Sequence, residues 1–378
     1  MRLLAPRAGE VVKVRQRPTR FSYWPTKQGN TREKLQTTLF ATDPWSLIRN
    51  RIEIITDTLA RKQAMAYLNQ ARDFFAATEE SEVSAAKPLL LYYSFLNLAK
   101  CFIVTKQGTP LGTVHHGLSE KLPASPGATH GHVSVDITKS PNSSAFVLFS
   151  RALVTSLPVP PTGSTHVQIR SQDFLAQVLI GHRVYCQSEN IKERFVSLDN
   201  IEYLHDPASK GVWLRVRTYA DDFTRLAYPL TTLSKALTGS LTWRNVICNK
   251  IHDSRRLIEA ETVQTLAYGQ RPSQVIGDLS RRASNKLWRS VTAYPPYRKY
   301  YLYSPAATQI IVHQLLSLYL ATFYFGSITR YKPEQFEAIL KSPLGPFVYE
   351  FFTNQPSQFV YLLASEFAEQ EVARAAIT

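Results

Sequence analysis

The densest mixture of cationic and aromatic side chains lies between residues 281 and 300. We predict an amphipathic helix over residues 273–290, on which Arg282, Lys286 and Arg289 share one face because they are spaced i, i+4 and i+7. The surrounding segment adds Arg281, Arg298 and Lys299 and the rings of Trp288, Tyr294, Tyr297 and Tyr300. Cations bind phosphates and aromatic rings stack on bases, so this pattern predicts a nucleic-acid-binding surface. The alternative is a solvated helix face whose rings belong to the core.

A second basic segment covers residues 1–40. It has nine Lys or Arg residues against two Glu residues, and aromatic residues at 21–24 interrupt the charges. We therefore predict a basic N-terminal arm, with Arg15, Arg17 and Arg20 as candidate nucleic-acid-binding residues. The alternative is an extension that is solvated or packed on an edge of the fold.

His252 is the best candidate for acid–base chemistry. A predicted helix over Trp243–Glu259 would align it with Asn249, Arg256 and Glu259 in one polar stripe. A histidine beside an arginine can transfer protons or hold a phosphate. Helical HEPN-type ribonucleases place a histidine after an arginine with four to six residues between them. Seven residues separate Arg244 from His252, so this is a near miss. The hypothesis names His252, Arg244 and Arg256 as catalytic, and the alternative is a solvated polar face.

The other histidines do not form a convincing metal site. His115 and His116 are adjacent, so on a strand they would point to opposite faces. His130 and His132 have only Asp136 nearby, whereas zinc requires three or four ligands. We expect no metal and no cofactor. His313 lies in an uncharged stretch, which predicts a buried, hydrogen-bonded histidine.

Several large enzyme classes are disfavoured by missing motifs. The sequence contains no P-loop and no GxGxxG after a predicted strand. It also lacks a GxSxG nucleophile elbow, a kinase signature, an HExxH motif and an EF-hand loop. Nucleotide-driven motors, dinucleotide oxidoreductases and typical hydrolases are therefore disfavoured, and whether the protein is an enzyme at all stays open.

The overall charge indicates the class of partner. The formal net charge is +15, from 44 Lys and Arg against 29 Asp and Glu, and Arg outnumbers Lys. Such an excess attracts polyanions, which include nucleic acid, anionic membranes and acidic proteins. The planar fork of arginine suits phosphate, which favours nucleic acid, either RNA or DNA.

The cysteines and the apolar stretches indicate the compartment. Cys101, Cys186 and Cys248 are far apart and form no CxxC pair, which is typical of a reducing cytosol. The N-terminal residues have no apolar run of signal-peptide length. Residues 310–328 are long enough to span a bilayer but carry several polar side chains, so we predict a buried core helix. A cytoplasmic protein without a membrane partner is expected.

The sequence divides into four segments that would position the candidate residues. They are a basic arm (1–40), a helical unit (41–135), a central α+β module (136–235) and a C-terminal helical unit (236–378). The predicted fold is mainly α with this central module, and its helical, bundle-like N- and C-terminal parts pack together. Asp43-Pro44 and Pro333 should begin helices, Ser304-Pro305 should begin the long uncharged one, and residues 85–105 should form a central buried helix.

Within the central module, the sequence predicts four short strands and one short helix. The strands are Ala145–Leu148, His166–Arg170, Arg183–Cys186 and Val212–Tyr219, and the helix covers residues 172–180. In the last strand Val212, Leu214 and Val216 alternate and should share the buried face.

Three stretches resemble a known family. They are Ala86–Ile103 (AKPLLLYYSFLNLAKCFI), His115–Leu122 (HHGLSEKL) and His313–Leu340, which contains an Arg-Tyr-x-Pro-x-x-aromatic turn at 330–336. Together with Asp43-Pro44-Trp45 they make the chain similar to the YaaC-like bacterial proteins. The resemblance implies an architecture and carries over no catalytic residue, and the basic arm has no counterpart in it.

Three functional hypotheses follow. The first is a nucleic-acid-engaging component of a larger assembly, and its placement in bacterial anti-phage defence rests on association alone. The second is the HEPN-like helical ribonuclease. The third is a non-enzymatic scaffold whose basic surface binds an acidic protein.

Overall fold

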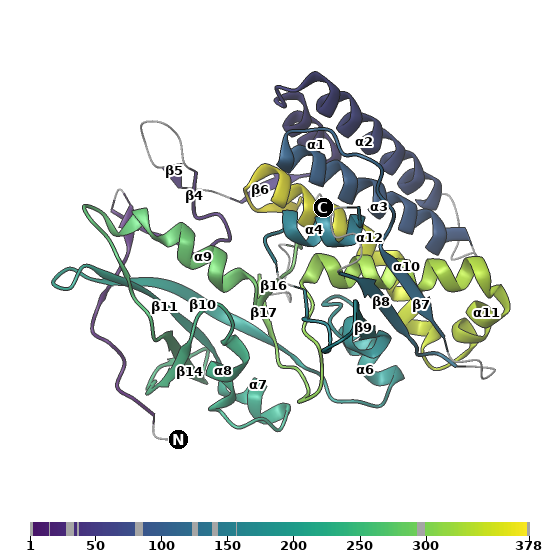
Figure 1. Cartoon of the computed structure of the whole chain (residues 1–378). Coiled ribbons are helices and arrows are strands. Elements are labelled where there is room, and N and C mark those ends of the chain that lie inside the picture. Colours follow the sequence, from purple (N-terminus) through teal and green to yellow (C-terminus); the bar gives the residue numbers. More distant parts are fainter. Residues whose placement is uncertain are drawn as a thin grey trace. The chain divides into compact units, whose positions relative to one another are not determined.

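The computed structural model describes residues 3–14, 16–27, 34–35, 38–79, 86–122, 128–137, 143–155, 157–292 and 299–375. The chain forms two compact units, each assembled from segments that are far apart in the sequence. Unit 1 comprises Met1–Thr42, Lys192–Ala306 and Glu369–Thr378, and unit 2 comprises Asp43–Ile191 and Ala307–Ala368. Unit 1 contains the large sheet, and unit 2 contains the long helices (Figure 1).

The expectation of a mainly α protein with a central α+β module is wrong. Helices make up 44% of the chain and strands 22%, and one antiparallel sheet has nine strands, so the fold is mixed α/β. The error lies largely in residues 243–303, which were assigned to a helical C-terminal part. In the structure they contribute the strands β12 to β17.

The main path of the sheet in unit 1 runs β12-β14-β11-β10-β17-β16, and neighbouring strands along it are antiparallel. The strands of this path are β10 (Phe195–Asp206), β11 (Gly211–Tyr219), β12 (Trp243–Val246), β14 (Arg255–Thr262), β16 (Leu287–Arg289) and β17 (Tyr300–Tyr303). Three short strands join it from the side: β1 (Glu10–Val11) on β10, β13 (Ile251–His252) on β14, and β15 (Leu266–Ala267) on β11.

One face of this sheet is apolar and packs against short helices. Val212, Leu214 and Val216 alternate along β11 and belong to the core cluster, which confirms the predicted strand and its buried face. The helices that contribute to this core are α7 (Ala220–Arg225), α8 (Thr232–Leu237) and α9 (Ile276–Ser284), and the 3₁₀ turn η1 (Pro272–Gln274) precedes α9. Apolar burial of this kind stabilises the unit by roughly 25 cal/mol per Å² of surface removed from water.

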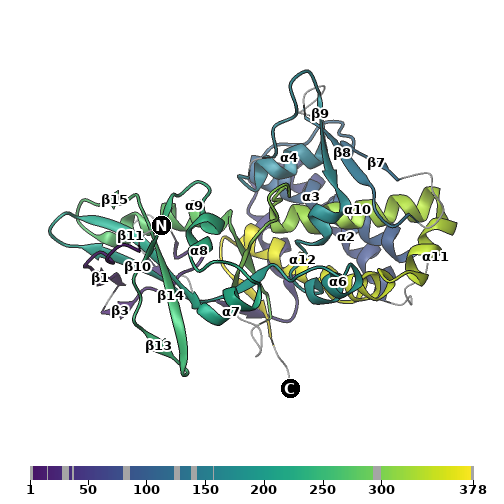
Figure 2. The same ribbon diagram turned by 90° about the horizontal axis from the view of Figure 1, so that it is seen from below.

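The described part of the N-terminal arm packs along the sheet of unit 1. The N–H of Val12 donates to the carbonyl of Tyr203 at 2.9 Å, and the N–H of Ile247 donates to the carbonyl of Leu4 at 2.9 Å. Val12 is fully buried in the core. Figure 2 shows β1 and β3 beside β10 and β11. The arm is therefore an edge-packed extension, which is the alternative to a free arm.

Smaller pairings complete unit 1. β2 (Lys13–Val14) pairs with β3 (Arg17–Pro18), and β4 (Thr26–Lys27) pairs with β5 (Lys34–Leu35). β6 (Leu39–Ala41) pairs in parallel with β18 (Val372–Arg374), so the first and last segments of unit 1 are joined directly.

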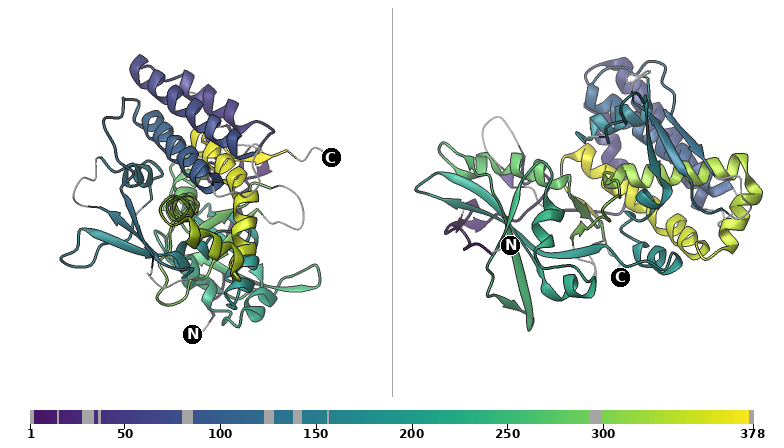
Figure 3. Two further views of the ribbon diagram at one scale, coloured as in Figure 1. Left: turned by 90° about the vertical axis from the view of Figure 1, so that its right-hand side faces the viewer. Right: turned by 60° about the horizontal axis from the view of Figure 1, so that its bottom comes forward.

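Unit 2 is built around two long helices, α3 (Ala86–Gln107) and α10 (Gln314–Tyr331). Both are apolar nearly all round, which is typical of central buried helices. The left view of Figure 3 looks along α10, drawn in olive, with α3 and α12 beside it. The other helices are α1 (Pro44–Glu53), α2 (Thr58–Glu79), α4 (Ala145–Ala152), α5 (Ser171–Leu175), α6 (His182–Ser188), α11 (Pro333–Lys341) and α12 (Gly345–Ala368). A small antiparallel sheet joins β7 (Leu118–Lys121), β8 (His132–Asp136) and β9 (His166–Arg170).

Local signals explain several helix and strand boundaries. The predictions for α1, α3 and α11 are confirmed, and Asp43 caps α1 by accepting from the N–H of Trp45. The strand at His166–Arg170 is confirmed as β9. The predicted helix at 172–180 is only the short α5.

Two predicted strands are helices in the structure, and one predicted helix start is wrong. Ala145–Leu148 lies in α4, whose N-terminus is capped by the hydroxyl of Ser144, and Arg183–Cys186 lies in α6. The long uncharged helix begins at Gln314, well after Ser304-Pro305, because the side chain of His313 caps it.

Among the described helices, α3 alone is long and apolar enough to cross a membrane by length and composition. Two-thirds of its most apolar window (67%) is buried inside the protein. A core helix passes the same test, so this criterion alone assigns no membrane span.

Candidate nucleic-acid interface

The positive charge of the chain is concentrated in unit 1. This unit contains 28 of the 44 Lys and Arg residues and 14 of the 29 Asp and Glu residues, a net charge of +14. Unit 2 contains the other 16 cations and 15 acids, a net charge of +1. The potential that attracts polyanions therefore originates almost entirely in unit 1.

The ratio of cations to acids is higher among the exposed residues of unit 1 than in the unit as a whole. Among its described residues, 14 Lys and Arg are exposed against 4 Asp and Glu. The exposed cations are Lys13, Arg17, Arg20, Lys192, Lys210, Arg225, Lys235, Lys250, Arg256, Arg271, Arg281, Arg282, Lys299 and Arg374, and the exposed acids are Glu10, Asp221, Asp253 and Glu369. The other described acids are half-buried or buried, so they oppose an approaching polyanion less directly.

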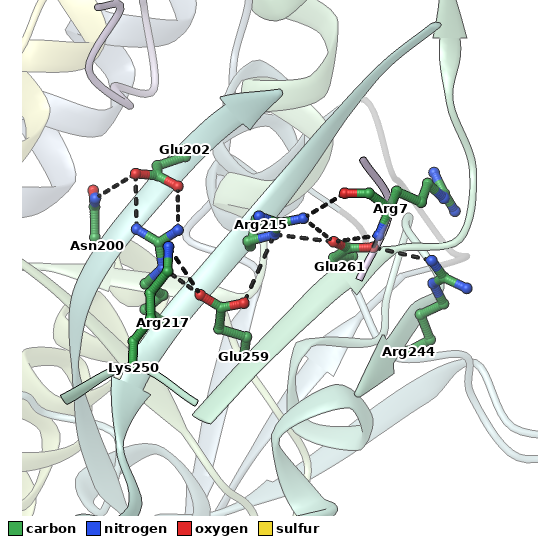
Figure 4. A network of polar contacts seen from close by, with 9 residues as sticks. All are labelled: Arg7, Asn200, Glu202, Arg215, Arg217, Arg244, Lys250, Glu259 and Glu261. Atoms are coloured by element: carbon green, nitrogen blue, oxygen red, sulfur yellow. Dashed lines mark hydrogen bonds and ion pairs between the residues drawn. The ribbon is translucent and has the colours of Figure 1, made fainter. Parts of the chain in front are cut away.

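A buried glutamate organises one end of a charged network on the polar face of the sheet (Figure 4). Glu261 is fully buried and forms an ion pair with Arg215, which lies directly opposite it on β11. It also accepts from Arg244 at 3.1 Å and from the backbone N–H of Arg7 at 3.2 Å. Arg244 therefore belongs to a structural network, far along the sheet from the His252 hairpin.

The other end of the network is arranged in the same way. Arg217 pairs with Glu259, which faces it from β14, and with Glu202 of β10 at 2.7 Å. These partners were missed in the sequence. They could have been found from the two-residue spacing: Arg215 and Arg217 point to one face of β11, and Glu259 and Glu261 have the same spacing on β14. Both arginines are held by internal carboxylates.

The predicted cationic helix face at 282–289 does not exist. Arg281 and Arg282 are exposed on α9 and pair with Asp278, at 3.8 Å and 2.8 Å. The helix ends at Ser284, so Lys286 follows it and Arg289 lies in β16. Only the two arginines on α9 therefore share a helical surface as predicted.

Lys286 and Arg289 serve packing. The side chain of Lys286 lies against Gly239, where its Cε would meet an added Cβ at 2.6 Å, and partial burial lowers the pKa of this lysine. Arg289 is buried and donates to the carbonyl of Val372 at 3.1 Å. Trp288 is buried as well, so its ring is not available to stack on a base.

Two predicted binding residues lie outside the described residues, namely Arg15 and Arg298. Lys299 is exposed and forms an ion pair with the buried Glu371. In the arm, Arg17 and Arg20 are exposed. The arm's rings are occupied: Tyr23 stacks on Tyr300 with centroids 5.7 Å apart and donates its hydroxyl to the carbonyl of Leu287.

His252 lies in a β-hairpin, and the predicted helix over Trp243–Glu259 is wrong. β13 and β14 are joined by Asp253 and Ser254, both with positive φ (49° and 60°), as in a type I′ turn. The Asn-Gly or Asp-Gly pair that usually marks such a turn is absent, so the hairpin could not be recognised from the sequence. The helical arrangement on which the HEPN-like hypothesis rested is therefore absent from these residues.

The partners of His252 differ from those expected. Its Nδ1 lies 2.8 Å from the hydroxyl of Tyr219 and 3.4 Å from Asp199. The cross-strand neighbour is Arg255, whose guanidinium lies 3.9 Å above the Tyr219 ring. Arg256 is exposed one residue further along β14. Neither Arg244 nor Arg256 is among the described contacts of this imidazole, so the proposed catalytic residues are not brought together.

His130, in unit 2, is held by polar partners. His130 bonds to Glu189 at 2.8 Å and to the hydroxyl of Ser171 at 3.2 Å, a Ser–His–Glu chain that the sequence did not reveal. Ser171 is fully buried, so no substrate reaches this hydroxyl. In the part of the chain that the structure describes, no three His, Cys, Asp or Glu side chains are grouped to hold a metal ion.

A protein-family model described as YaaC-like Protein matches residues 30–367. Comparisons with curated proteins and with solved structures find no match. The matched range covers nearly all of unit 2 and starts after β1, β2 and β3. The arm residues Arg17 and Arg20 therefore lie outside it.

Proposed function

Since this chain belongs to the YaaC-like protein family, and membership alone assigns no activity, we propose that it engages nucleic acid through the phosphate backbone. Unit 1 is the binding unit. Its exposed cations, including Arg17, Arg20, Arg281 and Arg282, contact phosphate oxygens. Each neutralised phosphate releases counterions, which is the main source of affinity in such complexes.

The separation of charge in unit 1 supports this proposal most strongly. Net charge is +14 in one unit and +1 in the other, and the most buried acids of unit 1, Glu259, Glu261 and Glu371, are paired internally. The described rings near the cations are packed, so bases have few partners for stacking. Binding should therefore depend weakly on sequence and steeply on salt.

The test is to purify the full chain at low salt and measure bound nucleic acid from the ultraviolet absorbance ratio, before and after a high-salt wash. Fluorescence anisotropy with labelled duplex DNA and single-stranded RNA then gives Kd against salt. Reversing two cations, as in Arg281→Glu/Arg282→Glu or Arg17→Glu/Arg20→Glu, should raise Kd more than about tenfold. It should also reduce the slope of log K against log salt by about 2 on duplex DNA.

The matched control is Lys62→Glu/Arg72→Glu, the same charge change at exposed positions on α2 of unit 2. It should leave both Kd and the salt slope near their original values. Equal weakening by the control, or salt-insensitive binding, would show that the location of charge in unit 1 does not matter. If the purified protein carries no nucleic acid and copurifies with an acidic protein, the scaffold hypothesis is favoured instead.

A further inference from the structure

A cavity of about 230 Å³ opens in unit 2, where α3, α10 and β7 meet. Its apolar walls include Leu89, Tyr92 and Leu96 of α3 and Phe323 of α10. The helices approach closely at Gly326, where an added Cβ would lie 3.1 Å from the carbonyl oxygen of Pro88. This close crossing forms one boundary of the cavity, and aromatic and aliphatic side chains line most of the rest.

Arg330 supplies a positive charge at the cavity. Its guanidinium donates to the hydroxyl of Tyr93 at 3.3 Å and lies 5.0 Å from the centre of the Tyr331 ring. Among the described residues, no carboxylate lies within ion-pair distance of it, whereas Arg215 and Arg217 of unit 1 are fully engaged. A planar guanidinium positioned by rings and lacking a carboxylate partner is well suited to an incoming anion.

His116 adds a second donor. Its Nδ1 accepts the N–H of Leu118 at 3.2 Å, so the neutral ring carries its proton on Nε2. His116 is exposed as a whole residue, but its ring lies 5.7 Å from Phe323, and desolvation there lowers the pKa of the imidazole, which favours the neutral ring. Within the described chain Nε2 has no hydrogen-bond partner, so it can donate to a ligand.

The charge and the size of the cavity limit the ligand. Glu120 also lines it and opposes Arg330, so with His116 neutral the site has no net charge to spare for a polyanion. Drug-sized ligands occupy pockets of about 300–1,000 Å³, larger than this cavity. A ligand with one ring or a fused pair of rings, and one negative charge, matches both limits.

The residues around the cavity are also those by which the chain resembles its family. Every residue that lines it lies in one of three stretches, Ala86–Ile103, His115–Leu122 or His313–Leu340. These stretches are distant in the sequence and meet here in space.

We propose that this cavity binds a small planar aromatic monoanion, with its ring against Tyr92, Tyr93 and Phe323 and its carboxylate on Arg330 and His116. The site shares no residue with the proposed nucleic-acid surface of unit 1, since all of its residues belong to unit 2. It gives the protein a small-molecule function that the charge of the chain does not indicate.

The test is calorimetry or ligand-observed NMR on the full chain with five probes. Benzoate carries a ring and one negative charge, phenyl phosphate carries a ring and close to two negative charges near pH 7, acetate and inorganic phosphate lack the ring, and benzamide lacks the charge. We expect benzoate binding, weaker binding of phenyl phosphate because Glu120 opposes its second charge, and no binding of the other three probes. Arg330→Gln should weaken benzoate binding at least about tenfold, because a charge-assisted hydrogen bond is lost.

Arg72→Gln is the matched control, since Arg72 is an exposed arginine of the same unit that does not line the cavity. Tyr93→Phe serves if Arg330→Gln fails to fold, because it removes only the hydroxyl that orients the guanidinium, and it should weaken binding by a smaller factor. The proposal is overturned if no ringed anion binds at millimolar concentration, or if benzamide binds as well as benzoate. It is equally overturned if Arg330→Gln and Arg72→Gln behave alike.

Discussion

Replacing Glu261 by alanine is expected to lower the free energy of unfolding of unit 1 by about 3 kcal/mol. The substitution leaves Arg215 and Arg244 without their shared carboxylate and removes the acceptor of the Arg7 N–H. Breaking a buried ion pair by removing one partner costs about 3–5 kcal/mol because the remaining charge is buried and uncompensated. The lower value is expected here, since the side chains of Arg215 and Arg244 keep 12% and 24% exposure and are partly rehydrated.

Denaturant unfolding, monitored by tryptophan fluorescence, reports mainly on unit 1. Four of the five tryptophans, Trp24, Trp213, Trp243 and Trp288, belong to unit 1. The matched variant is Glu193→Ala, which breaks the more exposed pair with Arg225 (2.9 Å) and should cost less than about 1 kcal/mol. Equal losses in the two variants would mean that burial of the network contributes nothing.

Acidification from pH 7 to pH 5 is expected to destabilise unit 2 by about 2 kcal/mol through His313. Burial lowers the pKa of this histidine from 6.5 to about 4, and its Nδ1 accepts the N–H of Leu315 as the cap of α10. Between these two pKa values the unfolded chain binds a proton that the folded chain does not. Stability from this group is therefore full above the unfolded pKa and declines as pH falls toward the folded pKa.

The variant His313→Asn isolates this contribution, because asparagine keeps a capping acceptor and does not titrate. Circular dichroism at 222 nm follows the long helices of unit 2 during denaturation at each pH. We expect the difference in stability between wild type and variant to shrink or change sign as pH falls. Parallel pH curves for the two proteins would contradict a neutral, buried His313 in the folded state.

The parts of the fold that were predicted correctly depend on local signals. Asp43 and Pro44 begin α1, and α3 was identified from an apolar run with Pro88 in its first turn. His313 was predicted as a hydrogen-bonded histidine, but inside the helix and buried, whereas it is the half-buried N-cap of α10. In each case the residues that determine the structure lie within a few positions of one another.

The parts that were missed depend on contacts between distant segments. Residues 243–259 show spacing that suits a helix, but Arg244 of β12 faces Glu261 of the neighbouring strand β14, and the β13–β14 hairpin between them has no turn marker in the sequence. Leu287–Arg289 becomes a strand because it pairs with Tyr300–Leu302. Tertiary pairing overrides local preference in such segments, and one sequence does not reveal the pairing.

The candidate surface was predicted in part. Exposure of Arg281 and Arg282 follows from their place on an amphipathic helix. Burial of Arg289 could not be inferred, because its acceptor is the carbonyl of Val372 near the other end of unit 1. The segregation of charge was also invisible, since unit 1 is assembled from three separate segments. The cavity of unit 2 likewise joins three stretches that the sequence keeps apart.

The joining of β6 to β18 has a consequence for how the protein is made. A ribosome releases Leu39–Ala41 long before Val372–Arg374, the strand partner that the described residues give this segment. The hydrogen bonds of Arg289 to Val372 and of Tyr300 to Glu371 also form only after this segment is synthesised. The nascent chain must therefore carry an unclosed, basic unit 1 next to ribosomal RNA while both segments of unit 2 are being synthesised. A message cut short before Glu371 would yield a product in which that unit never closes.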